Sequence, residues 1–246
     1  MSGHSKWSTI KRKKEKTDSK RGQIFTKIGR ELAVAVKEGG PDPEHNSRLR
    51  DAIAKAKANN MPQDTIMRSI KKAAGESGSI NYESVVYEGY GPGGVAVIVE
   101  ALTDNRNRTA SEVRYCFDKN GGSLGATGCV SWMFERKGVI VIENTGNIDE
   151  EELIMTALEA GADDVNDADG DFEVTTTPAA FSEVYDALEK SGYAIAMAEV
   201  QMVPSNTVEV TGEAEQSFLK MLDMLDDSDD VQNIYHNAEL QDDDKE

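Results

Sequence analysis

Cysteine and histidine are scarce, and the few that occur are scattered along the chain. The 246 residues include two cysteines, Cys116 and Cys129, and three histidines, His4, His45 and His236. These positions form neither a C-x-x-C nor an H-x-x-x-H pair, so the spacings typical of disulfide scaffolds and zinc sites are missing. We therefore expect no metal site, and we expect both cysteines to be small buried side chains.

Long apolar runs are missing as well. No segment approaches the roughly 18 consecutive apolar residues that a membrane-spanning helix requires. Residues 1–21 are almost wholly polar and basic, unlike the apolar centre of a signal peptide. With 38% hydrophobic and 29% charged residues, the composition is that of an ordinary soluble protein. These features predict a cytoplasmic protein with no membrane partner.

The common signatures of enzymes do not occur. The sequence contains no G-x-x-x-x-G-K-S/T, G-x-S-x-G or H-E-x-x-H motif. Residues 89–94, G-Y-G-P-G-G, have the letters of the dinucleotide motif G-x-G-x-x-G. The residues that follow, 95–100, have the pattern of a strand, whereas that motif needs a helix facing pyrophosphate. We interpret the glycines as a hairpin turn, and we predict no small-molecule cofactor and no enzymatic activity.

Positive charge is concentrated at the beginning of the chain. The net charge is −18, but residues 1–75 contain 18 Lys or Arg and 8 Asp or Glu, a net charge of +10. Residues 76–246 therefore carry a net charge of −28. The electrostatic field at a surface follows the charges within a Debye length, about 8–10 Å. Such segregation indicates a polyanionic partner more strongly than the overall isoelectric point does.

Residues 1–21 form a basic arm with almost no apolar periodicity, which we expect to be extended or disordered on its own. Three short amphipathic helices are predicted after it. In the first, 23–37, apolar residues recur at helical spacing before Gly39. The second begins near Asn46, a favoured N-cap residue, and the third follows Pro62 and ends at Gly75. The polar face of the first helix carries Lys27, Arg30 and Lys37.

The pattern changes after Gly78. Residues 85–88 and 95–102 predict the two strands of a hairpin. The segment from Thr109 to Glu112 has the S/T-x-x-E form of a capping box, which predicts a helix from there to about residue 119. Arg106 and Arg108 fall in the turn before this helix.

The rest of the chain predicts two α+β units. Between residues 138 and 203 the order is β-α-β-β-α-β, which fits a ferredoxin-like sandwich of four antiparallel strands with two helices on one face. After Pro204, a strand, a helix and an apolar stretch at 231–235 complete the ββα unit begun at residue 80. The predicted strands are 139–143, 164–166, 172–177, 194–203 and 207–211, and the helices are 149–160, 179–191 and 214–225.

The predicted fold class is α+β, with a small N-terminal helical bundle plus two ferredoxin-like α/β domains, the second inserted in the first. The domains are a basic helical one at 1–78, a split α+β one at 79–137 plus 204–240, and an inserted one at 138–203. The acidic tail, 241–246, is expected to be disordered.

We predict a nucleic-acid-binding surface, because Lys and Arg displace counterions from a phosphate backbone. The alternative for the basic run is a solubilising tail. Trp7 either stacks on an unpaired base or anchors the arm against the bundle. Arg106 and Arg108 either contact phosphate near a helix N-terminus or bond neighbouring carboxylates. The predicted contact residues are Lys6, Trp7, Lys11, Arg12, Lys13, Lys14, Lys20, Arg21, Lys27, Arg30, Arg106 and Arg108.

Several motifs together resemble the YebC family of bacterial proteins, whose mitochondrial relative is a translational activator of cytochrome c oxidase. The resemblance covers nearly the whole chain, and the joint order of the motifs is highly specific. The motifs are G-H-S-K-W at 3–7, R-G-Q-I-F-T-K at 21–27, R-L-R at 48–50, N-N-M-P at 59–62, Y-E-G-Y-G-P-G-G at 87–94, T-D-N-R-N-R-T at 103–109 and Y-H-N at 235–237.

This resemblance implies three domains and a role in gene expression without catalysis. The family is described both as DNA-binding transcriptional regulators and as ribosome-associated translation factors, so DNA and ribosomal RNA both remain expected partners, and the ribosome with them. No helix-turn-helix with base-reading side chains stands out in the sequence to favour DNA. The alternative is an adaptor that uses its acidic α/β domains to hold a basic protein of the transcription or translation machinery.

Overall fold

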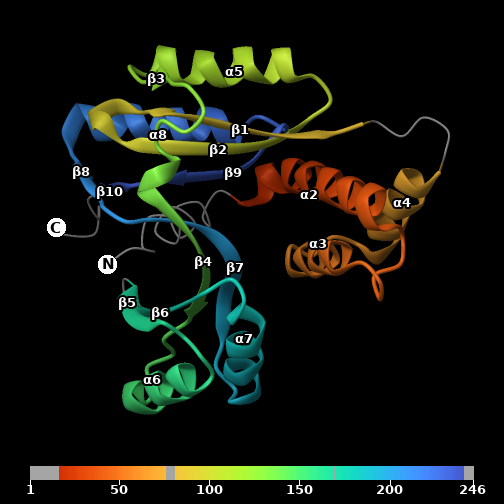
Figure 1. Ribbon diagram of the computed structural model, residues 1–246, viewed down its shortest axis with the longest axis vertical. Coiled ribbons are helices and arrows are strands. Elements are labelled where there is room, and N and C mark those ends of the chain that lie inside the picture. The colour runs from red at the N-terminus through yellow and green to blue at the C-terminus, as the bar shows by residue number, and fades with distance from the viewer. Residues whose placement is uncertain (1–16, 76–80, 169, 241–246) are drawn as a thin grey trace.

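The computed structural model describes residues 17–75, 81–168 and 170–240. Most of the basic arm and the acidic tail, including Asp242, Asp243 and Asp244, lie outside these ranges. The fold is α+β, as predicted: a helical bundle, a four-stranded sheet with two helices, and a second sheet with two more helices (Figure 1). Within the described ranges, no helix has the length and apolar character needed to span a membrane.

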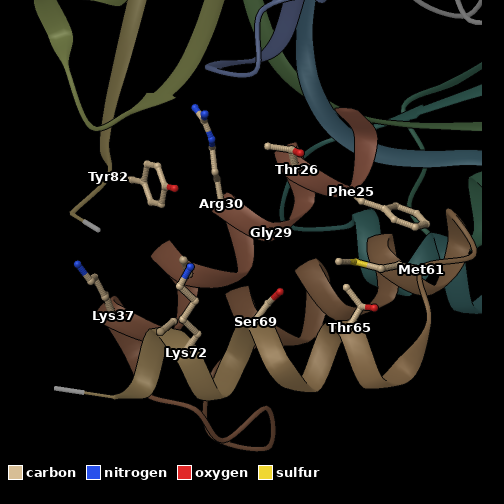
Figure 2. Close-up of a pocket in the computed structure, with 12 residues that line it drawn as sticks. Phe25, Thr26, Gly29, Arg30, Lys37, Met61, Thr65, Ser69, Lys72 and Tyr82 are labelled. Carbon is tan, nitrogen blue, oxygen red and sulfur yellow. The ribbon is translucent and has the colours of Figure 1, made fainter. Parts of the chain in front are cut away.

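The N-terminal bundle consists of three helices, and Figure 2 shows the first and third packed side by side. Its apolar core includes Ile28, Leu32, Leu49 and Ile66, all at most 1% exposed. Asn46 caps the second helix by accepting from the Leu49 amide, and it also donates to two carbonyls at the end of the first. The helices are α2 (Thr17–Gly39), α3 (Ser47–Ala58) and α4 (Gln63–Ala74).

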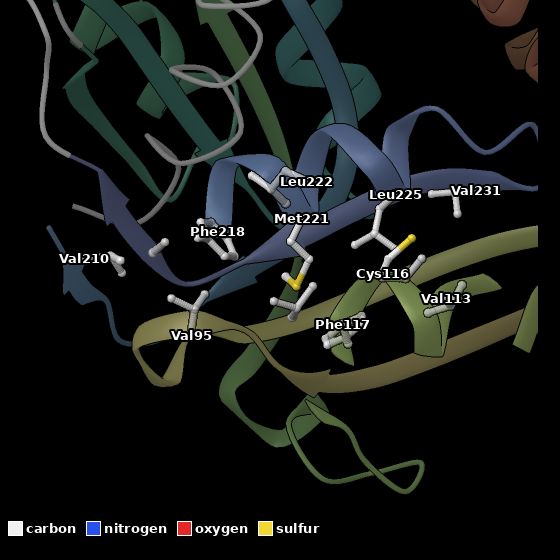
Figure 3. Close-up of a cluster of buried hydrophobic side chains, with 13 residues drawn as sticks. Val95, Val113, Cys116, Phe117, Val210, Phe218, Met221, Leu222, Leu225 and Val231 are labelled. Carbon is white, nitrogen blue, oxygen red and sulfur yellow. The ribbon is translucent and has the colours of Figure 1, made fainter. Parts of the chain in front are cut away.

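The split α+β unit has a four-stranded sheet in the order β3-β1-β2-β9, with α5 and α8 on one face. Figure 3 shows side chains of both helices meeting in the core, among them Phe117 of α5 and Phe218 of α8. Cys116 is buried in this core, as predicted, whereas Cys129 is only half-buried. The elements are β1 (Glu83–Tyr90), β2 (Ala96–Thr103), α5 (Arg106–Lys119), β3 (Ser123–Leu124), α8 (Gly212–Asp226) and β9 (Val231–His236).

The glycine-rich segment at 89–94 forms the predicted hairpin turn. β1 and β2 pair in an antiparallel register that ends at Tyr90 and Ala96. A short 3-10 helix, η1 (Pro92–Gly94), connects them, and Gly93 and Gly94 have φ angles of 75° and 77°. Side chains rarely adopt positive φ, so glycine is favoured at these two positions. The motif therefore has a structural explanation that needs no cofactor.

The inserted unit has the predicted ferredoxin-like topology. Its strands lie in the order β5-β6-β4-β7, every neighbouring pair is antiparallel, and the core between sheet and helices includes Ile140, Leu153 and Leu188. The elements are β4 (Phe134–Ile142), α6 (Glu150–Glu159), β5 (Asp164–Ala168), β6 (Asp171–Thr176), α7 (Phe181–Lys190) and β7 (Ile195–Pro204).

Long strands join the two sheets. The first residue of β4, Phe134, packs with Ala96, Ile98 and Tyr235 on the face of the first sheet opposite its helices. The same strand then becomes the centre of the second sheet (Figure 1). The predicted boundary between residues 137 and 138 thus falls inside a continuous strand. We propose the domain limits as predicted, 79–137 with 204–240 for the split unit and 138–203 for the inserted unit. A two-stranded parallel sheet, β8 (Val208–Val210) with β10 (Ala238–Leu240), completes the described fold.

Candidate nucleic-acid interface

The predicted contact residues fall into two groups. Most of the basic arm lies outside the described residues, namely Lys6, Trp7, Lys11, Arg12, Lys13 and Lys14. Lys20 and the exposed Arg21, expected to belong to an extended arm, lie instead in the first turns of α2, which begins at Thr17. The other four, Lys27, Arg30, Arg106 and Arg108, have described side chains, so their surroundings can be compared with the prediction.

The polar face of α2 is turned toward the acidic end of α8. Lys27 donates from Nζ to the Asp226 carbonyl at 2.8 Å and pairs with the Asp226 carboxylate at 3.2 Å. One turn later, Arg30 donates to the Leu102 carbonyl at 2.9 Å and forms an ion pair with Asp230. The side chains of Lys27 and Arg30 are only 13% and 14% exposed. The bundle therefore uses two predicted phosphate contacts to dock on the body of the protein.

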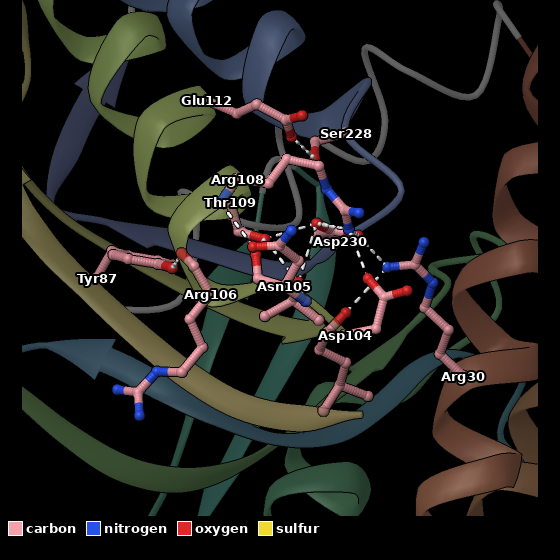
Figure 4. Close-up of polar contacts among 12 residues, drawn as sticks. Arg30, Tyr87, Asp104, Asn105, Arg106, Arg108, Thr109, Glu112, Ser228 and Asp230 are labelled. Carbon is pink, nitrogen blue, oxygen red and sulfur yellow. Dashed lines mark hydrogen bonds and ion pairs between the residues drawn. The ribbon is translucent and has the colours of Figure 1, made fainter. Parts of the chain in front are cut away.

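Asp230 is the centre of this polar contact, and it is 3% exposed. Arg108 donates to Asp230 Oδ2 at 2.8 Å, and the Thr109 and Thr103 hydroxyls donate to the same oxygen at 2.6 and 3.2 Å (Figure 4). Burial alone would raise the pKa of Asp230, but the hydrogen bonds from Thr109, Arg108 and Arg30 outweigh it and lower the pKa to about 2. Asp230 is thus a charged acceptor that ties α2 to α5.

The start of α5 differs from the predicted capping box. The helix begins at Arg106, and its N-cap is Asn105, whose side chain accepts from the Arg108 amide at 3.1 Å. The expectation that Thr109 caps the helix is wrong, because the Thr109 hydroxyl lies inside the first turn and bonds Asp230. Asn105 and Thr109 are both cap-forming residue types, and only the distant Asp230 distinguishes their roles.

The two arginines of this turn have different surroundings. Arg108 is 43% exposed and bonds both Asp104 and Asp230, which is the carboxylate-bonding alternative considered for it. Arg106 is 67% exposed, and its nearest carboxylate, on Glu83, is 3.7 Å away. Figure 4 shows the Arg106 side chain directed away from Asp230. Of the pair, Arg106 is the better placed to meet an external phosphate.

The predicted contacts do not include a set of exposed cations on α3 and α4. Two of its members pair with glutamates of α2, Arg48 with Glu38 and Lys55 with Glu31. Helical spacing places the cations of α3 around its apolar residues and those of α4 opposite its apolar stripe, so the sequence contained the signal. The set comprises Arg48, Arg50, Lys55, Lys57, Arg68, Lys71 and Lys72.

A groove of about 360 Å³ runs along the surface of the packed helices α2 and α4 and extends to Tyr82 at the entry to β1 (Figure 2). Lys37 and Lys72 lie at one end of it, and Phe25 and Met61 lie at the other. The groove thus combines a cationic end with an apolar end inside the basic part of the chain. Such a combination suits a ligand that has both charged and planar apolar parts.

Two family models match this chain over most of its length. The model described as "TACO1/YebC protein N-terminal domain" matches residues 5–76, and the model described as "TACO1/YebC second and third domain" matches residues 82–238. The first covers the basic bundle and the second covers both sheets.

Similar proteins occur in several bacteria. A "probable transcriptional regulatory protein" of Acetivibrio thermocellus is 63% identical over 238 residues, covering 96% of this chain and 98% of the relative. A protein of the same description from Thermoanaerobacter pseudethanolicus is 56% identical over all of both chains. The crystal structure of a conserved hypothetical protein from Aquifex aeolicus matches with a TM-score of 0.82 and 47% identity, over 93% of this chain and 94% of that one.

Proposed function

The chain belongs to the TACO1/YebC family, and on this premise we propose that it is a cytoplasmic, non-enzymatic regulator of gene expression that binds nucleic acid. Relatives more than half identical to it are described as probable transcriptional regulatory proteins. These descriptions support a regulatory role, and the test below distinguishes DNA from ribosomal RNA as the partner.

The observation that carries the proposal is the separation of charge between the bundle and the body. Residues 1–75 carry a net charge of +10 in a chain whose overall charge is −18. On the described part of the bundle, cations such as Arg68 and Lys71 project from α4 into solvent. A polyanion gains affinity from each phosphate that it brings to such a surface, through the release of condensed counterions.

The arrangement favours contacts to the backbone over base reading. The docked cations, Lys27 and Arg30, fix the orientation of the bundle against α8, which leaves the opposite surface of α3 and α4 exposed. Phosphate contacts of this kind position a protein on a nucleic acid without specifying sequence. Structured RNA, whose shape is read mainly through its phosphates and sugars, suits this surface at least as well as duplex DNA.

The test is a titration of the full-length protein with duplex DNA and with ribosomal RNA at several salt concentrations. The slope of log K against log salt for duplex DNA should be about −0.9 for each phosphate contact. Replacing Lys11, Arg12, Lys13 and Lys14 with glutamine should flatten that slope. A control variant with Lys190 and Lys220 changed to glutamine, both exposed on the acidic body, should leave it unchanged. Equal slopes for the two variants would exclude phosphate binding by the arm.

A second candidate function is an adaptor that holds a basic protein on the acidic body. Two observations favour it: residues 76–246 carry a net charge of −28, and Trp132 is exposed by 73% with its indole N–H bonded to the Cys129 carbonyl. Exposed tryptophans are frequent centres of protein interfaces. If a partner from cell extract is retained by Trp132→Ala but lost when the basic arm is neutralised, the adaptor function is excluded for this surface.

A further inference from the structure

One position in the wall of the groove between α2 and α4 has no side chain. Gly29 lines the groove in the middle of α2, and a Cβ added there would meet no described atom within 4 Å. A glycine in a helix interior costs about 1 kcal/mol relative to alanine. Packing does not require the glycine, because space for a side chain is present. The glycine therefore lowers the stability of α2, and a groove that stays empty gives no reason for this cost.

One end of the groove offers positive charge. Lys72 of α4 is exposed and forms no hydrogen bond or ion pair with any residue of the described ranges. Lys37 lies opposite on α2 and donates to the Asn81 side chain at 3.3 Å, a long and exposed bond (Figure 2). An anion at this end of the groove would lie near two ammonium groups, both of which attract it. Phosphate is the anion whose contacts the proposed function requires.

The middle of the groove offers hydroxyl groups that its own helix does not use. Serine and threonine within helices commonly donate to the carbonyl four residues earlier, as Thr26 does to Gly22 at 3.0 Å. Thr65 and Ser69 line the groove one turn apart on α4, and neither hydroxyl makes such a bond within the described part of the chain. They are half-buried, so each can bond a ligand while shielded from bulk water. Sugar hydroxyls and base edges provide suitable partners.

The other end of the groove is apolar, and the aromatic ring of Tyr82 lies nearer the lysine end (Figure 2). Met61 is buried and Phe25 half-buried at the apolar end. Tyr82 covers the groove from the entry to β1, where the Arg30 guanidinium lies 5.3 Å from its ring centre. The Arg30 contact holds the ring in place, because a cation over an aromatic face is attracted to it. Planar heterocycles bind well against apolar and aromatic side chains such as Met61 and Phe25.

We propose that this groove binds one nucleotide unit, with the phosphate between Lys37 and Lys72, the sugar beside Thr65 and Ser69, and the base against Phe25 and Met61. The volume of about 360 Å³ lies within the usual range for small-ligand sites, roughly 300–1,000 Å³. The proposal deepens the proposed function by assigning a site for an unpaired nucleotide. The unit belongs either to a single-stranded nucleic acid or to a free mononucleotide, which share this chemistry.

The first test uses a substitution that fills the groove without changing the charge of the protein. In Gly29→Met the new side chain occupies the groove, and the substitution favours the helix because methionine has the higher helix propensity. Gly22→Met is the matched control, since Gly22 is an exposed glycine of the same helix outside the groove with equal space around it. Full-length proteins are titrated with a labelled single-stranded oligonucleotide, and separately with a nucleoside monophosphate. Circular dichroism verifies that both variants keep their helices.

A second pair of variants tests the phosphate end. Lys72→Gln removes the groove lysine, whereas Lys190→Gln removes an exposed lysine of the acidic body that does not line the groove. Lys72→Gln should reduce the slope of log K against log salt for the single strand by about 0.7, the value of one phosphate contact. Lys190→Gln should leave the slope unchanged, and Gly29→Met should weaken oligonucleotide binding about tenfold, or 1.4 kcal/mol. Gly22→Met should bind like the original protein.

The outcomes separate this proposal from the proposed function. If Gly29→Met binds the oligonucleotide as the original protein does, while neutralising the basic arm abolishes binding, the groove is excluded and the nucleic-acid function stands. If Gly29→Met blocks only the monophosphate, the groove is a site for free nucleotides. Absence of binding to both probes by the unaltered protein would exclude the groove as a nucleotide site, while the titrations with duplex DNA and ribosomal RNA decide the proposed function separately.

Discussion

At the scale of single residues, Asp230 contributes most to holding the bundle on the body. Its carboxylate is 3% exposed and receives bonds from Arg30, Arg108, Thr103 and Thr109. A buried charge is tolerated because these donors replace the water that burial removes. The sequence offers no sign of this role, since Asp230 is one of several aspartates in an acidic run at 226–230.

Replacing Asp230 with asparagine should destabilise the protein by about 3 kcal/mol, because Arg30 would remain buried without its counter-charge. Chemical denaturation followed by circular dichroism measures the change. Asp229→Asn is the control, since Asp229 is exposed in the same loop. A loss of the same size in both variants would mean that general charge in the loop, and not the buried contact, is responsible.

The same residue predicts how stability depends on acidity. The pKa of Asp230 falls from 3.8 to about 2 on folding, so its ionised form is favoured in the folded state. This contribution, about 2 kcal/mol, is present above pH 4 and is lost as the pH falls through 2. Between pH 4 and pH 2, the unaltered protein should lose more stability than Asp230→Asn does. Parallel denaturation curves across that range would contradict the assignment.

Glu173 has the opposite effect on stability. It lies in β6, is 1% exposed, and burial raises its pKa to about 7. Because the folded pKa exceeds the ordinary value of 4.5, ionisation opposes folding as the pH rises from 4.5 to 7. Glu173→Gln should therefore stabilise the protein at pH 8 by at most about 3 kcal/mol and have little effect at pH 4. Thermal denaturation at the two pH values measures the difference, and a gain independent of pH would contradict this explanation.

At the scale of elements, one buried glutamate organises the loop between β3 and β4. Glu88 of β1 is 3% exposed and accepts from the amides of Gly128, Val130 and Ser131 at 2.8, 3.0 and 2.8 Å. Burial alone would raise the pKa of Glu88, but these amides lower it below its usual value. The loop ends in η2 (Ser131–Met133), which carries the exposed Trp132.

Glu88→Gln should loosen this loop, because an amide nitrogen would face backbone N–H donors in place of an acceptor. The expected loss of stability is about 2 kcal/mol, the cost of leaving a buried donor unsatisfied. Trp132 fluorescence, measured with Trp7 changed to Phe, should report a changed environment. Glu83→Gln, an exposed position on the same strand, serves as control and should change neither quantity. An unaltered Trp132 signal in Glu88→Gln would show that the loop does not depend on this carboxylate.

Most elements could be predicted from the sequence because their signals are local. Asn46 caps its helix, Gly93 and Gly94 make a hairpin turn, and the β-α-β-β-α-β order in the inserted unit yields a ferredoxin-like topology. Each of these depends on neighbours within a few residues or on the order of strands and helices. Bounds were less predictable, since α2 begins six residues before its apolar periodicity does.

The surroundings of the predicted contact residues could not be predicted in the same way. Lys27 and Arg30 have the spacing of a solvent-facing cationic surface, yet their partners, Asp226 and Asp230, lie about 200 positions further along the chain. The N-cap of α5 is Asn105, and the predicted cap Thr109 donates instead to the same distant carboxylate of Asp230. Periodicity identifies the polar face of a helix, but only the tertiary fold decides whether that face meets water or another charged element.

At the scale of the whole molecule, the basic bundle is attached to an acidic body partly through their opposite charges. Figure 1 shows α2 lying beside the split sheet, where Lys27 and Arg30 reach the end of α8 and the start of β9. These side chains are largely shielded from solvent, so salt screens them less than it screens surface pairs. The docked cations position the bundle, and the exposed cations of α3 and α4 remain accessible to a polyanion.

Exchanging the charges of the ion pair between Lys27 and Asp226 tests whether charge holds the bundle on the body. Lys27→Asp places a carboxylate against Asp226, and the repulsion should detach the bundle or change its orientation, which small-angle X-ray scattering would detect as a larger radius of gyration. Asp226→Lys alone should act similarly, and the double variant should recover most of the original dimensions because the attraction is restored with exchanged signs. Thermal denaturation should follow the same order, with each single variant losing about 1–3 kcal/mol and the double variant less than their sum. If the double variant were as expanded as the singles, packing and not charge would hold the bundle on the body.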